Sequence, residues 1–253
     1  MSQVQSVERT FTILELLAQY PNGIRITELA SEMDLAKSTV HRLLKTLSNR
    51  GYVQQTHNGH YQLGIQCLVL ASSLLNDLDI RSLAKDSLEL LAASSKEVVH
   101  LCIHDRQEVV YVDKVESNQT IRMYSQIGKR AYMHCTGVGK ALLTGFKEQE
   151  IEQLITDKGL PVFTDTTITT KEKLLEELDM IKESGYAIDE QEHENGIRCI
   201  AAPIYDYSGK VVAAISIAGP IDRMTKERVN GELAVEIKKH SARISSKLGY
   251  VSN

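Results

Sequence analysis

The chain has 253 residues, of which 42% are hydrophobic and 25% charged, and its formal net charge is −4. This composition is that of an ordinary globular protein, and the length suits two domains. No apolar run approaches the roughly 20 residues of a membrane-spanning helix, and residues 1–6 do not resemble a signal peptide. The four cysteines have no paired short spacing, which argues against a zinc module or a disulfide framework. We therefore expect a cytoplasmic protein that does not act at a membrane and carries neither a cofactor nor a metal.

The first predicted element is a helix over residues 6–19, which ends at the turn Pro21-Asn22-Gly23. Apolar residues recur along it at helical spacing, and we expect them to close a small three-helix core: Val7, Phe11, Leu14 and Ala18. A short helix over residues 26–33 and a turn over residues 34–36 follow.

A longer amphipathic helix is predicted over residues 37–50, with Gly51 as its C-terminal stop. One face is apolar, with residues at i, i+3, i+4 and i+7: Val40, Leu43, Leu44 and Leu47. The opposite face carries side chains that can donate to phosphates and base edges: Lys37, Ser38, Thr39, His41, Arg42 and Lys45. The short helix, the turn and this helix together have the pattern of a helix-turn-helix.

A hairpin is predicted directly afterwards, because residues 52–56 and 60–63 flank Asn58-Gly59, a strong short-range hairpin signal. Helix pairs of this kind are common, and a basic outer face is often only a solvated face. The hairpin favours DNA binding, since a wing at this place contacts the neighbouring backbone or the minor groove. Asn58 and His60 are its candidate contacts. We predict a winged helix-turn-helix domain over residues 1–64.

Charge is divided unevenly between this segment and the rest of the chain. Residues 1–64 hold six Lys and Arg against five Asp and Glu, a net charge of +1, whereas the remainder holds 23 against 28, a net charge of −5. A weakly basic DNA-binding segment joined to an acidic remainder favours site-specific DNA binding over non-specific electrostatic binding.

Two apolar helical stretches, residues 65–75 and 80–95, are broken by Asn76-Asp77-Leu78-Asp79 and form a predicted linker region over residues 65–96. A helical connection transmits orientation better than a flexible one. The same residues also suit a plain first helix of the second domain, and both interpretations stay open.

The remaining residues, 97–253, mix strands and helices, which predicts an α+β domain. Strands are expected at residues 98–103, 109–112, 121–126, 198–205 and 210–217. Helices are expected at residues 137–144, 148–156, 169–182 and 226–248. Val99, Leu101 and Ile103 alternate as in a half-buried strand, and Thr169-Thr170-Lys171-Glu172 predicts a capping box for a helix that stops at Gly185.

Four blocks of the sequence resemble the IclR family of bacterial transcription regulators. They are KSTVHRLL at residues 37–44, MHCTGVGKALL at 133–143, DEQEHENGIRCIAAP at 189–203 and VAAISIAGP at 212–220. The third block is the most specific, because it combines acidic residues, a glycine, Arg-Cys and Ala-Ala-Pro at fixed spacing. The resemblance runs over essentially the whole chain in the family's order.

This resemblance implies an N-terminal winged helix, a linker helix and a C-terminal effector-binding domain with a GAF-like fold. Members of the family act as dimers or tetramers on palindromic operators. Small molecules, often carboxylic acids or aromatics of catabolic pathways, adjust that binding. Both repressors and activators occur.

The resemblance also implies an effector site between the helix after Gly137 and the strands that carry Cys199 and Ser216. Backbone amides at a helix start favour a carboxylate there, and the mixture of apolar walls with few polar groups suits a small molecule. The candidate residues are Met123, Ala131, Gly137, Val138, Asp189, Ile197, Cys199 and Ser216. Ala218 stands where many relatives carry a second serine, which leaves the ligand class open.

Each candidate also has a plain structural interpretation. Cys199 suits a buried small hydrophobic residue, and the glycines suit a tight turn. Ser216 can bond across the sheet, and Met123 suits the core.

Enzymatic chemistry has less support in the sequence. A nucleotide-binding loop ending at Gly139-Lys140 would need Gly at position 134 and Ser or Thr at 141, where His134 and Ala141 stand. A thiol enzyme has its residue types without any local spacing that supports a triad: Cys135, Cys199, His134, His193 and Asp189. The two histidines and Asp189 would also suit a metal by ligand type alone.

We expect a transcription regulator, and more specifically a repressor, whose affinity for a pseudo-palindromic double-stranded DNA operator changes when a carboxylate-containing catabolic metabolite binds. It would act as a homodimer or homotetramer, and it would not be an enzyme. The alternative is a thiol-dependent enzyme or a partner-docking protein that uses the C-terminal pocket, with turnover that depends on Cys199 or Asp189.

Overall fold

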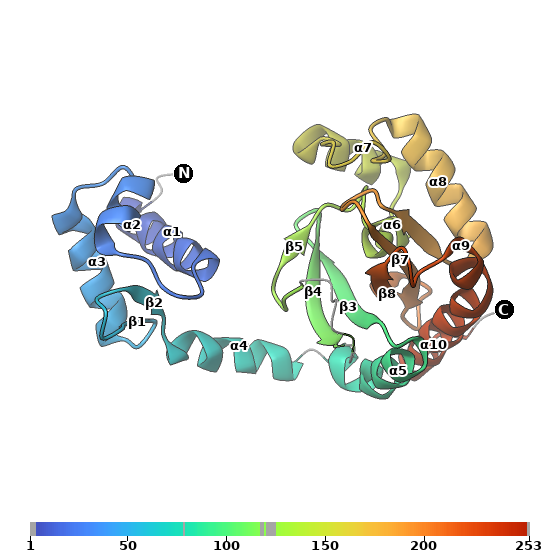
Figure 1. Cartoon of the computed structure of the whole chain (residues 1–253), viewed down its shortest axis with the longest axis horizontal. Coiled ribbons are helices and arrows are strands. Elements are labelled where there is room, and N and C mark those ends of the chain that lie inside the picture. Colours follow the sequence, from blue (N-terminus) through green and yellow to red (C-terminus); the bar gives the residue numbers. More distant parts are fainter. Residues whose placement is uncertain (1–3, 78, 117–118, 120–124, 252–253) are drawn as a thin grey trace. The chain divides into compact units, whose positions relative to one another are not determined.

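The structure, a computed structural model, describes residues 4–77, 79–116, 119 and 125–251. The chain divides into two compact units, Met1–Leu78 and Asp79–Asn253. Figure 1 shows the helices and strands of each unit. No described helix is both long and apolar enough to cross a membrane.

The first unit contains the predicted winged helix-turn-helix together with α4, which comes from the predicted linker region. Its elements are α1 (Gln5–Gln19), α2 (Ile26–Glu32), α3 (Lys37–Asn49), β1 (Val53–Gln55), β2 (Tyr61–Leu63) and α4 (Ile65–Asp77). The two strands pair antiparallel, with Val53 opposite Leu63. Val40, Leu44 and Leu47 of α3 are buried, so the predicted apolar face of this helix does face the core.

The prediction for the apolar face of α1 is wrong. Val7 and Phe11 are 48% and 57% exposed, and Ile13 and Leu17 are buried in their place. The helix carries two apolar stripes at helical spacing, and the spacing by itself does not indicate which one meets α3. Leu14, between the two stripes, packs partly buried against the core.

The wing turns through three residues between Thr56 and His60. The Thr56 N–H donates to the His60 carbonyl, and the Gly59 N–H donates to the Thr56 carbonyl. Gly59 has a φ of +78°, which a side chain tolerates poorly, so the glycine of the Asn-Gly pair is what allows this turn.

The second unit is built on a six-stranded antiparallel sheet in the order β5-β4-β3-β8-β7-β6. Its strands are β3 (Val98–Asp105), β4 (Glu108–Val115), β5 (Arg130–Ala131), β6 (Ala187–Glu190), β7 (Ile197–Tyr205) and β8 (Val211–Pro220). Its helices are α5 (Asp79–Ser95), α6 (Gly137–Leu143), α7 (Glu148–Lys158), α8 (Lys171–Ser184), α9 (Lys226–Arg228), the π-helical turn η1 (Val229–Leu233) and α10 (Ala234–Lys247). The domain has the expected α+β, GAF-like architecture.

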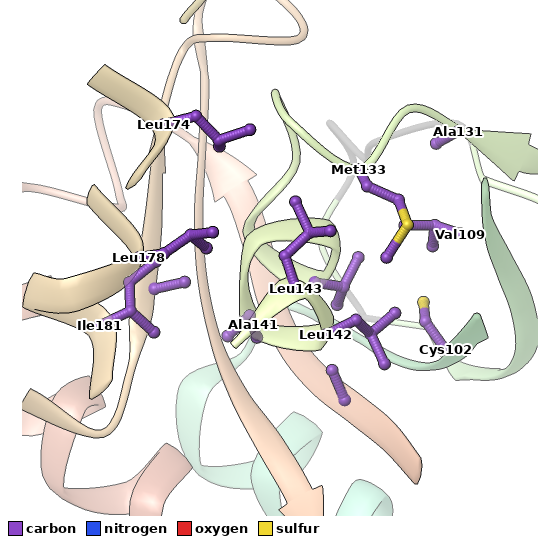
Figure 2. Close-up of a cluster of buried hydrophobic side chains, with 14 of the residues drawn as sticks. Cys102, Val109, Ala131, Met133, Ala141, Leu142, Leu143, Leu174, Leu178 and Ile181 are labelled. Carbon is purple, nitrogen blue, oxygen red and sulfur yellow. The ribbon is translucent and has the colours of Figure 1, made fainter. Parts of the chain in front are cut away.

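Helices cover both faces of this sheet. Helices α5 and α10 pack on one face, and α6 packs on the other with α8 behind it (Figure 1). Figure 2 shows Leu174, Leu178 and Ile181 of α8 pointing toward α6, and Met133 and Val109 on the opposite side of that helix. The short helix α6 is therefore enclosed on all sides, and all seven of its residues are buried.

Burial of both faces explains why β3 departs from the predicted alternation. Val98, His100 and Cys102 are buried as fully as Val99 and Leu101, because α6 covers the side that the pattern assigned to solvent.

Three smaller predictions also differ from the structure. Helix α8 begins at Lys171 after Thr170, whose hydroxyl accepts from the Lys173 N–H, so the capping box that starts at Thr169 is wrong by one residue. The predicted final helix is interrupted by η1. Residues 121–124 of the strand expected at 121–126 lie outside the described residues, and Ser125 and Gln126 are not in a strand.

Candidate DNA interface and effector site

The outer face of α3 presents most of the predicted DNA contacts to solvent. Lys37, Ser38, His41, Arg42 and Lys45 are exposed, and Thr39 is half-buried. They share this helix with three buried core residues, so the core fixes the helix while the polar side chains stay accessible. Ala36, at the N-cap, supplies no side-chain cap to the first amides.

The two predicted wing residues differ in their surroundings. Asn58 is exposed at the tip of the hairpin, whereas His60 is half-buried. A Cβ built on Gly23 would lie 3.0 Å from the Cβ of His60, which places His60 over the turn between α1 and α2. Tyr61 continues this connection, because its N–H donates to the Ile24 carbonyl. The wing is thus anchored at its base and open at its tip.

Thr46 is an exposed residue on α3 that the sequence reasoning did not select. Its hydroxyl donates to the carbonyl of Arg42 at 3.0 Å, one turn earlier on the helix. The spacing of four residues from Arg42 was the available signal, since it places both on one side of the helix.

Four of the predicted effector residues come together where α6 begins. A Cβ built on Gly137 would lie 3.4 Å from the Cβ of Ala201, 3.6 Å from the Cβ of Cys199 and 3.7 Å from the amide nitrogen of Asp189. Asp189 and Cys199 are directly opposite each other on β6 and β7. Val138 follows Gly137 and is also buried. The first turn of α6 therefore faces the paired strands that carry the carboxyl and the thiol.

Asp189 is the buried acid of this group. Its side chain is 3% exposed, and its Oδ1 accepts from the Glu192 N–H at 2.7 Å. Burial, together with the nearby charge of Glu192, raises the pKa of Asp189 to about 7 from its usual value of 3.8. The carboxyl is therefore close to half-protonated at neutral pH, and it can donate as well as accept a hydrogen bond.

Ser216 belongs to a polar chain that crosses the sheet. Its hydroxyl lies 3.4 Å from Nδ1 of His100, and Nε2 of the same ring lies 2.8 Å from the hydroxyl of Ser125. Burial, assisted by the charge of Lys114, lowers the pKa of His100 to about 4, so the ring is neutral at pH 7. His100 and Ser125 were not selected from the sequence. The predicted alternation assigned His100 to the solvent side of β3, so its position between apolar strand residues was the only available signal.

The other predicted effector residues are placed less centrally. Ile197 packs beside Cys199 in a small cluster with Val98 and Ala218. Ala131 lies on β5, at the opposite edge of the sheet from Asp189, and belongs to the core around Met133 (Figure 2). Met123 lies outside the described residues.

A buried ion cluster lies one turn further along α6. The ammonium group of Lys140 pairs with Glu177 at 2.8 Å and with Glu192 at 2.5 Å, and the lysine side chain is fully buried. Burial opposes its charged form, but the two carboxylates outweigh burial and raise the pKa of Lys140. Because Glu192 also donates its N–H to Asp189, this cluster is connected to the candidate effector site.

The thiols lack the features of an activated nucleophile. Sγ of Cys135 lies 3.6 Å from Nδ1 of His193, but burial raises the pKa of Cys135 to about 12. Burial also raises the pKa of Cys199, with a further contribution from Asp189. A nucleophilic cysteine needs a lowered pKa. Among the described residues, no three His, Cys, Asp or Glu side chains form a group that could hold a metal ion.

A helix-turn-helix with an exposed polar face, joined in one chain to a GAF-like domain with a buried polar site, defines a DNA-binding transcription regulator. Two family models match the chain. The IclR helix-turn-helix domain matches residues 6–57, and the bacterial transcriptional regulator IclR C-terminal domain matches residues 72–246. The chain therefore belongs to the IclR family, whose members are transcription regulators rather than enzymes.

Individual relatives agree with this assignment over nearly the full length. The HTH-type transcriptional regulator XynR of Escherichia coli K12 is 35% identical over 254 residues, which covers 99% of each chain. The transcriptional repressor IclR of the same organism is 36% identical and covers 93% of this chain and 87% of its own. The crystal structure of the Thermotoga maritima IclR superposes with a TM-score of 0.82 at 32% identity, covering 98% of this chain and all of the other.

Proposed function

We propose that this regulator is a repressor that binds a pseudo-palindromic operator as a homodimer and is controlled by a small carboxylate. The exposed polar face of α3 on a buried apolar core is the observation that carries the DNA-binding part. Helix α3 would lie in the major groove, with Ser38, His41 and Arg42 nearest the bases and Lys37 and Lys45 on phosphates. The uncapped first amides of α3 support a phosphate contact as well.

The wing would contribute a second, weaker contact. Asn58 stands at its exposed tip. His60 and Tyr61 contact Gly23 and Ile24 in the connection between α1 and α2, which fixes the direction in which the wing extends. A fixed wing loses little entropy on binding, so Asn58 is the better candidate for a backbone or minor-groove contact than the half-buried His60.

The first turn of α6 supports a carboxylate as the effector. The hydroxyl of Thr136 accepts from the Gly139 N–H, which leaves the amides of Gly137 and Val138 as donors for a ligand. Asp189 lies on β6 next to this turn. In its protonated form it would donate a hydrogen bond to a carboxylate rather than repel it. We therefore expect effector affinity to fall as the pH rises above about 7.

Exposed apolar residues on the first unit support a homodimer. Val4, the N-cap of α1, and Phe11 on α1 are 63% and 57% exposed, and Ile65 and Leu68 on α4 are 70% and 59% exposed. Apolar stripes of this length on helices mark interaction surfaces, and a two-fold pair of readers requires a self-complementary interface. The same stripes are compatible with a tetramer made of two dimers. Light scattering coupled to size-exclusion chromatography would distinguish the two.

The experiment that tests the whole proposal is a gel shift with the DNA upstream of the protein's own gene and excess competitor. A panel of aliphatic and aromatic carboxylates is added, each beside its uncharged amide. One carboxylate should change operator affinity by about 5–150-fold, the range of a typical allosteric coupling, while its amide does not.

Two glycine variants localise the response. Gly137→Ala places a methyl group against Cys199 and Asp189 and should abolish the response while the shift itself persists. Gly231→Ala meets no atom within 4 Å and should respond like the unmodified protein. Loss of the specific shift at every upstream fragment would contradict the DNA-binding part. An unchanged response in Gly137→Ala would contradict the effector site.

A further inference from the structure

A cavity lies in the second unit, on the side of β6 that faces away from α6. Ala187 and Asp189 of this strand are buried toward α6, whereas the alternate residues Ile188 and Glu190 line the cavity. Helix α8 and the segment α9–η1 form the other walls, and the volume is about 460 Å³. This space is large enough for a small organic molecule.

Four apolar side chains line the cavity beside its charged and polar ones. Met180 and Ile181 come from α8, Ile188 from β6 and Val229 from the π-helical turn η1. Met180 is 57% exposed, although methionine is a residue that usually packs in cores or on ligands. Turns of the π type are rare and are often found at functional sites.

Among the described residues, Glu177 and Glu192 share one cation at the wall of this cavity, Lys140, at 2.8 and 2.5 Å. The third carboxylate of the lining, Glu190, pairs with Arg198, and Lys226 also lines the cavity, so carboxylates and cations are equal in number. Glu192 is only 5% exposed, and its Oε2 has no hydrogen-bond partner in the described part of the chain. A buried carboxylate oxygen without a donor is costly, so an additional donor would stabilise it.

The nearest arginine does not supply that donor. Nε of Arg198 donates to Glu190 at 2.8 Å, and Nη1 of the same side chain donates to the carbonyl of Met224. The hydrogen bond from Arg198 lowers the pKa of Glu190, with a smaller contribution from the charge of Lys226, which is exposed at the α9 wall.

We propose that this cavity binds a small organic ammonium compound, whose ammonium group donates to Glu192 and Glu177 and whose apolar body packs on Met180, Ile188 and Val229. Both a simple amine and an apolar amino acid have this chemistry. The amino acid would in addition place its carboxylate near Lys226. The cavity lies on the other side of β6 from the candidate effector site, and Glu192 connects the two through its N–H bond to Asp189. This proposal does not depend on the function proposed above.

The test is isothermal titration calorimetry of the full-length protein with three probes of one carbon skeleton. L-leucinamide carries only the ammonium charge, L-leucine carries both charges, and 4-methylpentanoate carries only the carboxylate. At least one ammonium probe should bind saturably, and 4-methylpentanoate should not bind at this cavity. Saturable binding of the carboxylate alone, or of no probe, would overturn the proposal.

Two variants locate the binding. Met180→Trp places a bulky ring at the wall of the cavity and should weaken the ammonium probe at least tenfold, whereas Leu90→Trp, on an exposed position of α5 outside the cavity, should leave it unchanged. Glu192→Gln should also weaken the probe at least tenfold. If Glu192→Gln unfolds, as thermal melting would show, Met180→Trp decides alone. Equal affinity in Met180→Trp and Leu90→Trp would refute the site.

Lys226→Ala separates the two ligand sources. A selective loss of L-leucine binding would identify an amino acid as the ligand class. An equal, small effect on L-leucine and L-leucinamide would identify a simple amine. Both results retain the ammonium site.

Discussion

The two units of this regulator place their polar side chains in opposite ways. In the first unit, Arg42 and Lys45 are exposed on a helix whose other face builds an apolar core. In the second unit, Lys140, Asp189 and Ser216 are buried within the core itself. Changes at the DNA-binding face should therefore alter affinity without altering stability. Changes at the proposed effector site should alter both, because the groups proposed to bind the effector, Asp189 and Ser216, also lie in the core.

The largest expected effect compares two lysines. Lys140→Met leaves the buried carboxylates of Glu177 and Glu192 without their cation, which should lower the free energy of unfolding of the second unit by about 3–5 kcal/mol. Lys45→Met changes an exposed side chain and should stay within about 0.5 kcal/mol. Thermal and denaturant unfolding of both variants would measure this. Equal unfolding free energies of the Lys140→Met and Lys45→Met variants would contradict the difference proposed between buried and exposed polar side chains.

A pair of glycines tests how closely α6 is enclosed. A Cβ on Gly139 would lie 2.3 Å from the carbonyl oxygen of Met133, so Gly139→Ala must displace backbone and should cost about 1–3 kcal/mol. Gly137→Ala meets its neighbours at 3.4 Å or more and should cost much less. Melting temperatures would rank the two variants, and the reverse order would show that the first turn of α6 is the more crowded one.

The stability of the second unit should depend on pH through Asp189. Because burial and Glu192 raise its pKa in the folded state to about 7, the protonated acid is favoured by folding. Its contribution to stability is complete below about pH 4 and is lost as the pH rises through 7. The stability of the unmodified protein, relative to Asp189→Asn, should therefore fall between pH 4 and pH 7 and then level off. A difference that is constant with pH would contradict the raised pKa.

Two buried serines provide the smallest effect. Ser216→Ala removes the partner of His100 Nδ1 and should cost about 1 kcal/mol. Ser87 is equally buried, but its hydroxyl has no hydrogen-bond partner among the described residues, so Ser87→Ala should be neutral or slightly stabilising. Denaturant unfolding at one pH is sufficient for this comparison. A greater loss in Ser87→Ala would argue against the polar chain through His100.

The local sequence pattern was sufficient to predict the winged helix-turn-helix. The i, i+3, i+4, i+7 spacing of α3 fixes which face is buried, and an Asn-Gly pair fixes the hairpin, so neither requires knowledge of distant contacts. Helix α1 shows the limit of this reasoning. It carries two apolar stripes, and only packing against α3 decides that Ile13 is buried and Phe11 is not.

The effector site depends on contacts that local pattern does not contain. Gly137, Asp189 and Cys199 came from the resemblance to the family, and the structure brings them together at the first turn of α6, where their role in binding stays a prediction. His100 was missed because its partners are 25 and 116 residues away. Lys140 was missed because its carboxylates lie 37 and 52 residues further along, and an isolated lysine in a sequence is expected at the surface.

The central claim is that the exposed face of α3 reads base sequence. Selection of binding sites from a random pool of double-stranded DNA tests it most directly, with the unmodified protein, Arg42→Ala and, as a charge-matched control, Arg50→Ala from the end of α3. The unmodified protein should enrich a pseudo-palindrome. Arg42→Ala should bind it about 10–100-fold more weakly and lose preference at one base pair in each half-site, the loss expected of one base contact. Arg50→Ala should keep the motif. The same motif, bound equally well by Arg42→Ala, would contradict the account.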